Sequence, residues 1–140
     1  MPVRVYYEDT DFSGVVYHAN YLRFAERGRS DFLRDMAVHH TDLIARTPPL
    51  AFAVHGMDMN FVASAHIDDM LEVRTTYTEL RGARLNGFQC ILRGDTLIWH
   101  SAVRAVIINA DTNKPARVPK DIADKITPYL TETLPAVFGF

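Results

Sequence analysis

The sequence predicts an α+β fold in which one long central helix is wrapped by a five-stranded antiparallel sheet. One stretch of the chain has helical periodicity over several turns, and four long stretches rich in strand-forming residues follow it. With a single substantial helix, the chain cannot cover both faces of a parallel sheet. An antiparallel sheet that packs one face on the helix is therefore the expected architecture.

The predicted helix spans residues 19–36. Tyr21, Ala25, Gly28 and Phe32 recur at spacings of four, three and four, which places them on one helical face. Glycine destabilises a helix by about 1 kcal/mol relative to alanine, but it also allows a flat surface to approach closely. We expect this face to lie on the sheet.

The strands are expected at residues 3–8, 50–62, 70–80, 84–92 and 96–109. Gly82 and the pair Gly94-Asp95 separate the last three, where hairpin turns require residues that tolerate a left-handed backbone. Short helices are expected at residues 41–46 and 119–126. Pro115 and Pro119 are expected to end the sheet.

The composition fits one globular domain over residues 1–140. A net charge of −2 favours neither nucleic-acid binding nor an anionic membrane surface. No stretch is apolar enough for membrane insertion, and the first residues do not resemble a signal peptide, so a cytoplasmic location is expected. The single cysteine, Cys90, lies in an apolar run and is interpreted as a packed strand residue rather than a nucleophile. The second face of the sheet remains apolar, which predicts at least a dimer.

The most informative segment spans residues 6–21. It places Asp11 in a loop with Gly14, just before the predicted helix. A carboxylate that faces the unpaired N–H groups of a helix start can attack, or direct water onto, a carbonyl that those groups polarise. This chemistry hydrolyses an activated acyl group without a metal or cofactor.

Other interpretations of these carboxylates stay open. Asp9 is more typical of a residue that closes a turn, and the same structural role is open for Asp11. The active sites of Mg²⁺-dependent phosphotransferases also begin with a similar Asp-x-Asp motif, but the fold of those enzymes needs alternating strands and helices. Glu26, on the helix, is a further candidate base, although a solvated or paired role is more typical.

His18 stands at the predicted helix start, where its backbone N–H would be unpaired and able to bind an oxyanion. The histidines show no metal-ligand spacing, so no metal site is predicted. Neither a nucleophilic serine elbow nor a dinucleotide fingerprint is present. Arg81 and Arg84 flank a predicted hairpin, where they form either a solvated turn or a phosphate-binding pair.

These residues resemble a known family. The runs 7–11 and 14–21 are similar to the 4-hydroxybenzoyl-CoA thioesterase family, and in particular to the bacterial acyl-CoA thioesterases associated with the Tol-Pal system. The similarity continues through residues 24–27, 61–62, 68–69 and 109–115. The family has the hotdog fold, in which an antiparallel sheet wraps one long helix, and this agrees with the pattern described above.

The resemblance implies a role for each candidate residue. Asp11 would act on the thioester carbonyl as nucleophile or as base for water, and the backbone N–H of His18 would bind the carbonyl oxygen. Tyr7 and the His18 side chain would line the site. The further implied substrate-binding positions are Gly14, Val16, Arg81 and Arg84, the two arginines near the CoA nucleotide.

The implied activity is hydrolysis of an acyl-CoA to free CoA and a carboxylic acid, without a cofactor. An acyl-carrier protein is the alternative acyl donor. The implied assembly is a dimer or a dimer of dimers (a homotetramer), with the site at a subunit interface. Two other functions stay open: an enoyl-thioester hydratase in which Asp11 and His18 form an acid/base pair, and a non-catalytic module that binds acyl chains or a cell-envelope partner.

Overall fold

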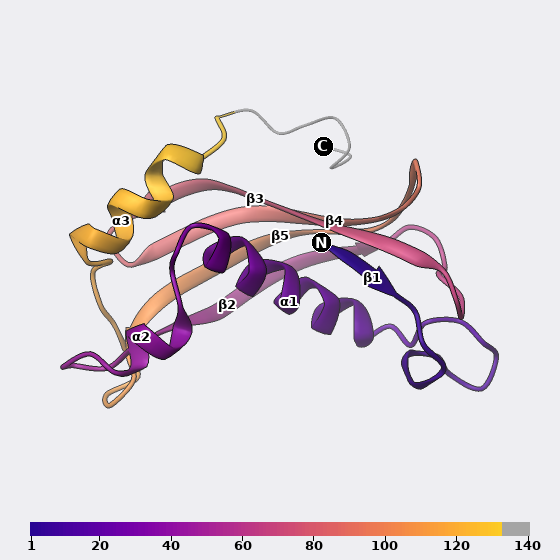
Figure 1. Cartoon of the computed structure of the whole chain (residues 1–140), viewed down its shortest axis with the longest axis horizontal. Helices are drawn as coiled ribbons and strands as arrows, with labels where there is room; N and C mark the ends of the chain where they lie inside the picture. The colour runs from indigo at the N-terminus through magenta and orange to yellow at the C-terminus, as the bar shows by residue number, and fades with distance from the viewer. Residues whose placement is uncertain (133–140) are drawn as a thin grey trace.

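The computed structural model describes residues 1–132, in which a curled antiparallel sheet lies against one long helix (Figure 1). Residues 133–140 of the predicted domain lie outside the described part. The strands are β1 (Pro2–Arg4), β2 (Leu50–Phe61), β3 (Met70–Arg81), β4 (Arg84–Arg93), β5 (Thr96–Asn109) and β6 (Lys114–Pro115). The helices are α1 (Asn20–Asp35), α2 (His40–Ile44) and α3 (Lys120–Ile126), with 3-10 turns η1 (Tyr7–Asp9) and η2 (Thr127–Tyr129).

The predicted α+β arrangement is confirmed. The strand order is β1-β3-β4-β5-β2, with β6 paired to β5, and every pairing is antiparallel. The long helix and the four long strands match their predicted ranges to within one residue at each end. Gly82 and Gly94 occupy the two hairpin turns at positive φ, as expected.

One prediction at the sheet's edge is wrong. The first strand ends at Arg4 rather than continuing to residue 8, because the Asp9 carboxylate accepts a hydrogen bond from the Tyr6 N–H at 2.9 Å and closes a turn. Pro115 is the last residue of the sheet, as predicted, and it pairs with Ile108 in the short strand β6, which was not predicted. An edge strand accepts proline because one side of its backbone needs no donor.

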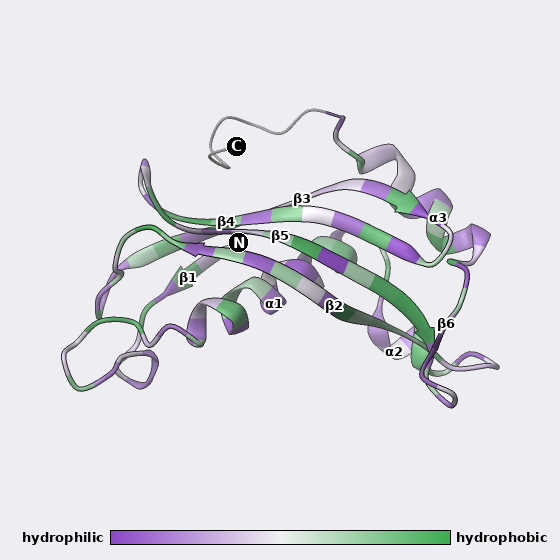
Figure 2. Ribbon diagram, turned by 180° about the vertical axis from the view of Figure 1, so that it is seen from behind, coloured by the Kyte–Doolittle hydropathy of each residue, from purple (hydrophilic) through white to green (hydrophobic). Residues whose placement is uncertain are grey.

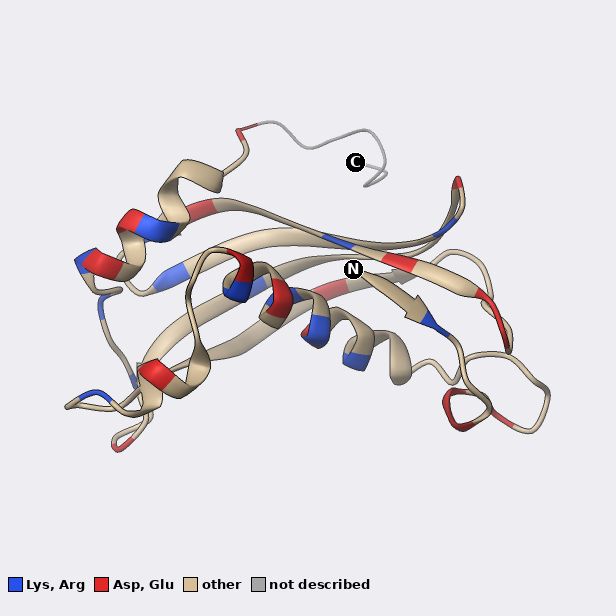
Figure 3. Cartoon of the chain, in the orientation of Figure 1, with Lys and Arg blue, Asp and Glu red and all other residues tan. Residues whose placement is uncertain are grey.

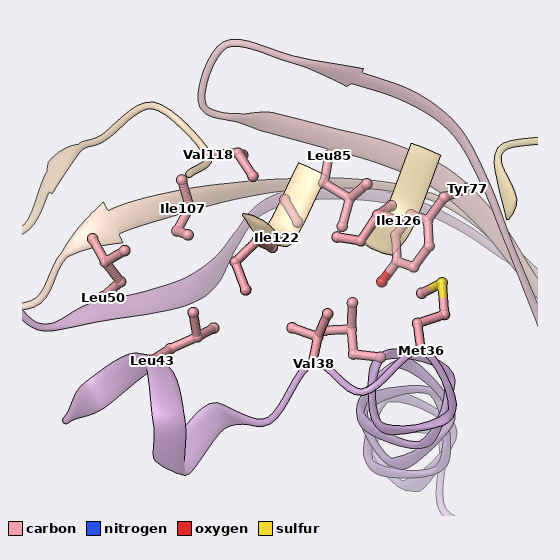
Figure 4. Close-up of a cluster of buried hydrophobic side chains, with 12 residues drawn as sticks. Met36, Val38, Leu43, Leu50, Tyr77, Leu85, Ile107, Val118, Ile122 and Ile126 are labelled. Carbon is pink, nitrogen blue, oxygen red and sulfur yellow. The ribbon is translucent and has the colours of Figure 1, made fainter. Parts of the chain in front are cut away.

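The core lies between α1 and the concave face of the sheet. Figure 2 shows hydrophobic and hydrophilic residues alternating along the strands, as expected when only one face packs on a helix. Near the start of α1, Phe24 and Trp99 are almost fully buried. At the other end, α2 and α3 add Leu43 and Ile126 to a second cluster, and Figure 4 shows these side chains converging under the sheet.

Gly28 sets how closely α1 lies on the sheet. A Cβ atom at this position would stand 2.6 Å from Cγ1 of Val73 and 3.3 Å from the Gln89 amide nitrogen. Gln89 is 1% exposed, and its amide donates to the carbonyl of Ala25 on α1 at 2.8 Å. The predicted close approach of the glycine face is therefore confirmed.

We expect Gly28→Ala to destabilise the protein. The added methyl group overpacks the contact with Val73, at a cost of about 1–3 kcal/mol, of which better helix propensity recovers at most about 1 kcal/mol. Urea unfolding at fixed protein concentration should show a lower midpoint with an unchanged slope. Arg27→Ala, on the exposed side of the same turn, is the matched control, and a Gly28→Ala protein as stable as wild type would contradict this packing.

Candidate active site

The loop that carries Asp11 is anchored to a distant part of the chain. The N–H of Val16 donates to the carbonyl of Ala65 at 2.8 Å, and Val15 forms an isolated bridge with His66. Gly14 has a φ of +82°, which gives the loop its sharp turn. The loop is therefore held at both sides rather than hanging from the end of β1.

The Asp11 carboxylate is fixed by local hydrogen bonds. One oxygen, Oδ1, accepts from the Ser13 hydroxyl at 2.5 Å and from the Ser13 N–H at 2.8 Å. Both bonds lower the pKa of Asp11 below its ordinary value, and the bond from the hydroxyl is the stronger cause. A backbone hydrogen bond from Val15 contributes to the same lowering. Asp11 is thus an ionised carboxylate at neutral pH.

The start of α1 is tied to the same loop. Asn20, 5% exposed, donates from its side-chain amide to the carbonyl of Asp9 at 2.8 Å, and Tyr17 donates its N–H to the same carbonyl at 3.0 Å. Within the described chain, the N–H groups of His18 and Ala19 have no acceptor. Unpaired N–H groups at a helix start, with the helix dipole behind them, favour an oxyanion.

Two further residues position the site, and neither was singled out from the sequence. Asn20 joins α1 to the turn of Asp9, and the Tyr21 hydroxyl accepts from the N–H of Ala65 at 3.2 Å. Tyr21 had been placed only on the apolar stripe of the helix. Its buried hydroxyl links α1 to the segment that anchors Val16, a contact between residues 44 positions apart. Nothing in the local pattern marks this pairing.

Asp11, Gly14 and His18 all lie in the loop that precedes α1. The ring of His18 lies 6.3 Å from that of Phe61, at the end of β2. Tyr7 is 82% exposed in η1, where its carbonyl accepts from Thr10. The Val16 side chain is buried in the core and its N–H is already bonded, so Val16 holds the loop in place.

Arg81 and Arg84 are not brought to this loop within one protomer. Arg84 pairs with a residue of β5 that also pairs with Ala53, near the beginning of β2. The loop lies beside Phe61, at the other end of β2. Eight residues of extended strand correspond to about 26 Å. The hairpin instead lines a surface groove with His55 and Pro115.

The surface around Asp11 is unusually rich in exposed apolar side chains. They come from the loop and from the segments that follow β2: Tyr6, Tyr7, Phe12, Tyr17, Phe61, Val62 and Ile67. Figure 3 shows that the loop also carries acidic residues, whereas basic and acidic residues mix along the outer side of α1. An exposed apolar patch beside a charged group is typical of a binding site or an interface.

Metal and thiol chemistry find no support in the described chain. Residues 1–132 contain no cluster of three or more histidine, cysteine, aspartate or glutamate side chains able to hold a metal ion. Cys90 is fully buried, as predicted, and burial raises the pKa of its thiol to about 11. None of the helices that the structure describes is long and apolar enough to cross a membrane.

Comparison with known proteins identifies the family. The family model of the thioesterase-like superfamily matches residues 5–126. The chain is 43% identical over 122 residues to the acyl-CoA thioester hydrolase YbgC of Escherichia coli O6:H1, covering 86% of this chain and 90% of that protein. It is 37% identical over 121 residues to the acyl-CoA thioesterase YbgC of Haemophilus influenzae, covering 86% and 88%.

A solved structure gives the same result. The probable thioesterase from Bartonella henselae superposes with a TM-score of 0.81 at 45% identity, covering 85% of this chain and 97% of that one. The curled sheet around α1 is the hotdog fold predicted from the sequence. The chain therefore belongs to the thioesterase-like superfamily and is a thioester hydrolase of the hotdog fold.

Proposed function

We propose that the protein hydrolyses acyl-CoA thioesters with Asp11 as the reactive carboxylate. The observation that carries this proposal is the ionised carboxylate of Asp11, held in the same loop that presents the unpaired N–H groups at the start of α1. The names of the relatives from E. coli and H. influenzae support an acyl-CoA as the substrate.

In this mechanism the thioester carbonyl oxygen accepts a hydrogen bond from the His18 N–H, which stabilises the negative charge that develops there. Asp11 then acts in one of two ways. As a nucleophile it forms an acyl anhydride and expels the CoA thiolate, and water hydrolyses the anhydride. As a general base it takes a proton from the attacking water. In both cases the products are free CoA and a carboxylic acid.

We further propose that two protomers pair through β2. This twelve-residue strand is a sheet edge, and its outer side has no strand partner among residues 1–132. Its exposed apolar residues include Val54, Met59 and Phe61, and a long apolar edge that stays unpaired promotes aggregation. Antiparallel pairing of β2 with its copy covers this edge about a two-fold axis. A dimer of such dimers is the larger assembly that the resemblance implies.

This pairing suggests a role for Arg81 and Arg84. An antiparallel β2 pair places the beginning of one strand beside the end of the other. The hairpin of the second protomer then lies at the Asp11 end of the first, about 14 Å away across three strand spacings. In this arrangement the two arginines bind the phosphates of the CoA nucleotide in the site of the neighbouring protomer.

The cellular setting is proposed from the resemblance alone. The match over residues 7–21 and 109–115 supports a member of the 4-hydroxybenzoyl-CoA thioesterase family that is associated with the Tol-Pal system and acts in the cytoplasm. An acyl-carrier protein remains the alternative acyl donor. Which acyl group the protein prefers is a separate question, and the cavity described below bears on it.

Asp11→Asn should lower kcat by about 100-fold or more while changing the affinity for acyl-CoA little, because the carboxylate acts in the chemical step. Thiol release measures kcat, and calorimetry measures binding. Glu8→Gln is the matched control, since Glu8 is an exposed carboxylate nearby. A near-normal kcat in Asp11→Asn would refute the assignment, and loss of enoyl absorbance without thiol release would indicate a hydratase instead.

Ser13→Ala should move the acidic limb of the pH–rate profile to higher pH. The Ser13 hydroxyl lowers the pKa of Asp11, so activity persists as the pH falls until the carboxylate is protonated below its ordinary value of 3.8. Without the hydroxyl, protonation occurs at higher pH and activity is lost earlier. Ser13→Thr, which keeps the hydroxyl, should restore the wild-type limb, and identical limbs in all three proteins would count against Asp11 as the essential base or nucleophile.

Mixing two inactive variants tests the shared site. Asp11→Asn and Arg84→Ala homodimers, once exchanged, form heterodimers in which one site holds both Asp11 and the second protomer's Arg84. About a quarter of all sites are then intact at random exchange, so activity should rise above that of either parent. If Arg84 served its own protomer, no heterodimer site would be intact, and mixing would restore nothing.

A further inference from the structure

A second candidate site lies between α1 and the sheet, beyond the Asp11 loop. It is a cavity of about 180 Å³, room for roughly six water-sized groups. Its polar lining comes from α1, α2 and β3: Glu26, Arg29, Ser30, His40 and Tyr77. Side chains of β2, β4 and β5 complete the walls.

Arg29 reaches this cavity without a carboxylate partner. Its guanidinium donates to the Gln89 side-chain carbonyl at 2.9 Å, and it forms no ion pair with any residue of the described chain. Gln89 is held in turn, because its amide nitrogen donates to the carbonyl of Ala25 and to the Thr75 hydroxyl. The amide orientation is therefore fixed, and with it the position of the guanidinium.

Tyr77 provides a second donor. The residue is 2% exposed and lines the cavity. Figure 4 shows the hydroxyl pointing from β3 toward the layer that holds the helices. Burial raises the pKa of Tyr77 to about 12, so the phenol stays protonated and able to donate.

The mouth of the cavity is formed by a polar pair and one exposed acid. The Ser30 hydroxyl lies 3.3 Å from Nε2 of His40, which joins α1 to α2. Glu26 is exposed, and its charge opposes the effect of burial, which lowers the pKa of Arg29. The groups that are fixed inside the cavity, Arg29 and Tyr77, are donors.

Exposed apolar side chains of β2 extend from this cavity toward the Asp11 loop. Val54, Met59 and Phe61 pair with residues of β5 that face α1, yet they remain exposed, because nothing in the described chain covers that side. Gln89 holds the guanidinium of Arg29 beside residues Ala25–Gly28 of α1. These residues lie five to eight positions beyond the start of α1, or about 8–12 Å along the helix axis.

We propose that this cavity binds a carboxylate at the far end of the acyl group, so that the preferred substrates are CoA thioesters of medium-chain dicarboxylic acids. The proposal rests on the thioesterase function and names its substrate class. The thioester lies at the start of α1, the methylene groups follow β2, and the terminal carboxylate accepts from Arg29 and Tyr77. An extended chain of roughly six to ten carbons spans this distance.

The chemistry of the lining favours a carboxylate over other terminal groups. A methyl end would leave the Tyr77 hydroxyl unpaired and the guanidinium without an anion. A hydroxyl end accepts from one donor but does not neutralise the charge of Arg29. A carboxylate offers two acceptor oxygens to two donors and pairs with the guanidinium in a charge-assisted bond.

The decisive comparison uses pairs of acyl-CoAs of equal length. Hexanedioyl-, octanedioyl- and decanedioyl-CoA are compared with hexanoyl-, octanoyl- and decanoyl-CoA, and 10-hydroxydecanoyl-CoA is included. The wild-type protein should prefer the dicarboxylic substrate by about tenfold or more in kcat/KM at the best length. Arg29→Met should abolish this preference, Tyr77→Phe should weaken it, and Arg27→Met, two residues away on the exposed face, should keep it.

A failure of this inference can be distinguished from a failure of the proposed function. If monocarboxylic substrates are cleaved as well as dicarboxylic ones at every length, or if the hydroxyl-tipped substrate is equally good, this inference is wrong while the thioesterase function stands. If no acyl-CoA releases thiol, the proposed function is wrong. The inference is then decided by calorimetry, in which Asp11→Asn should bind decanedioyl-CoA about tenfold more tightly than decanoyl-CoA. Equal affinities would overturn it.

Discussion

The close contact of α1 with the sheet at Gly28 is the constraint on which the rest of this structure depends. Because the helix carries no side chain there, Gln89 can reach across from β4 and bond to the helix carbonyl of Ala25. That same amide holds Arg29 at the cavity. The start of the helix is fixed by a separate bond, from Asn20 to the turn of Asp9. One helix thus carries both candidate sites, and its distance from the sheet sets the geometry of each.

The two candidate sites stabilise charge in opposite ways. Asp11 lies at the surface, where hydrogen bonds from its neighbour Ser13 keep it ionised without a paired cation. It is therefore negatively charged at neutral pH, as the proposed chemistry requires. Arg29 is largely enclosed, and burial lowers the pKa of its guanidinium. A charge in such surroundings gains more from an anionic ligand than an exposed one does, because water screens it less.

The sequence predicted the fold well because periodic patterns determine its long elements. The stripe from Tyr21 to Phe32 defined α1, and glycines marked the hairpins. The error arose where a single side chain overrides the pattern: the Asp9 carboxylate ended β1 early. Asp11, Gly14 and His18 were adjacent in sequence, so their grouping could be predicted.

The second site could not be predicted in the same way. Gln89 and Arg29 are separated by 60 positions and meet only because the sheet folds over the helix. In the sequence, Arg29 is one of several arginines on a helix, and Tyr77 is one aromatic residue in a strand. Neither residue type signals a ligand until the cavity that both residues line is seen.

The open edge of β2 joins the dimer proposal to the substrate proposal. Val54, Met59 and Phe61 lie on the helix-facing side of β2, at the very edge that would pair with a second protomer. An acyl chain lying there alone would leave one side of its methylene groups in water, and the pair between Arg29 and a carboxylate would be weakened by solvent. A second protomer across β2 would cover that side and exclude water from it. The same surface therefore serves assembly and selectivity, and a protein held monomeric should lose its discrimination between acyl groups along with its activity.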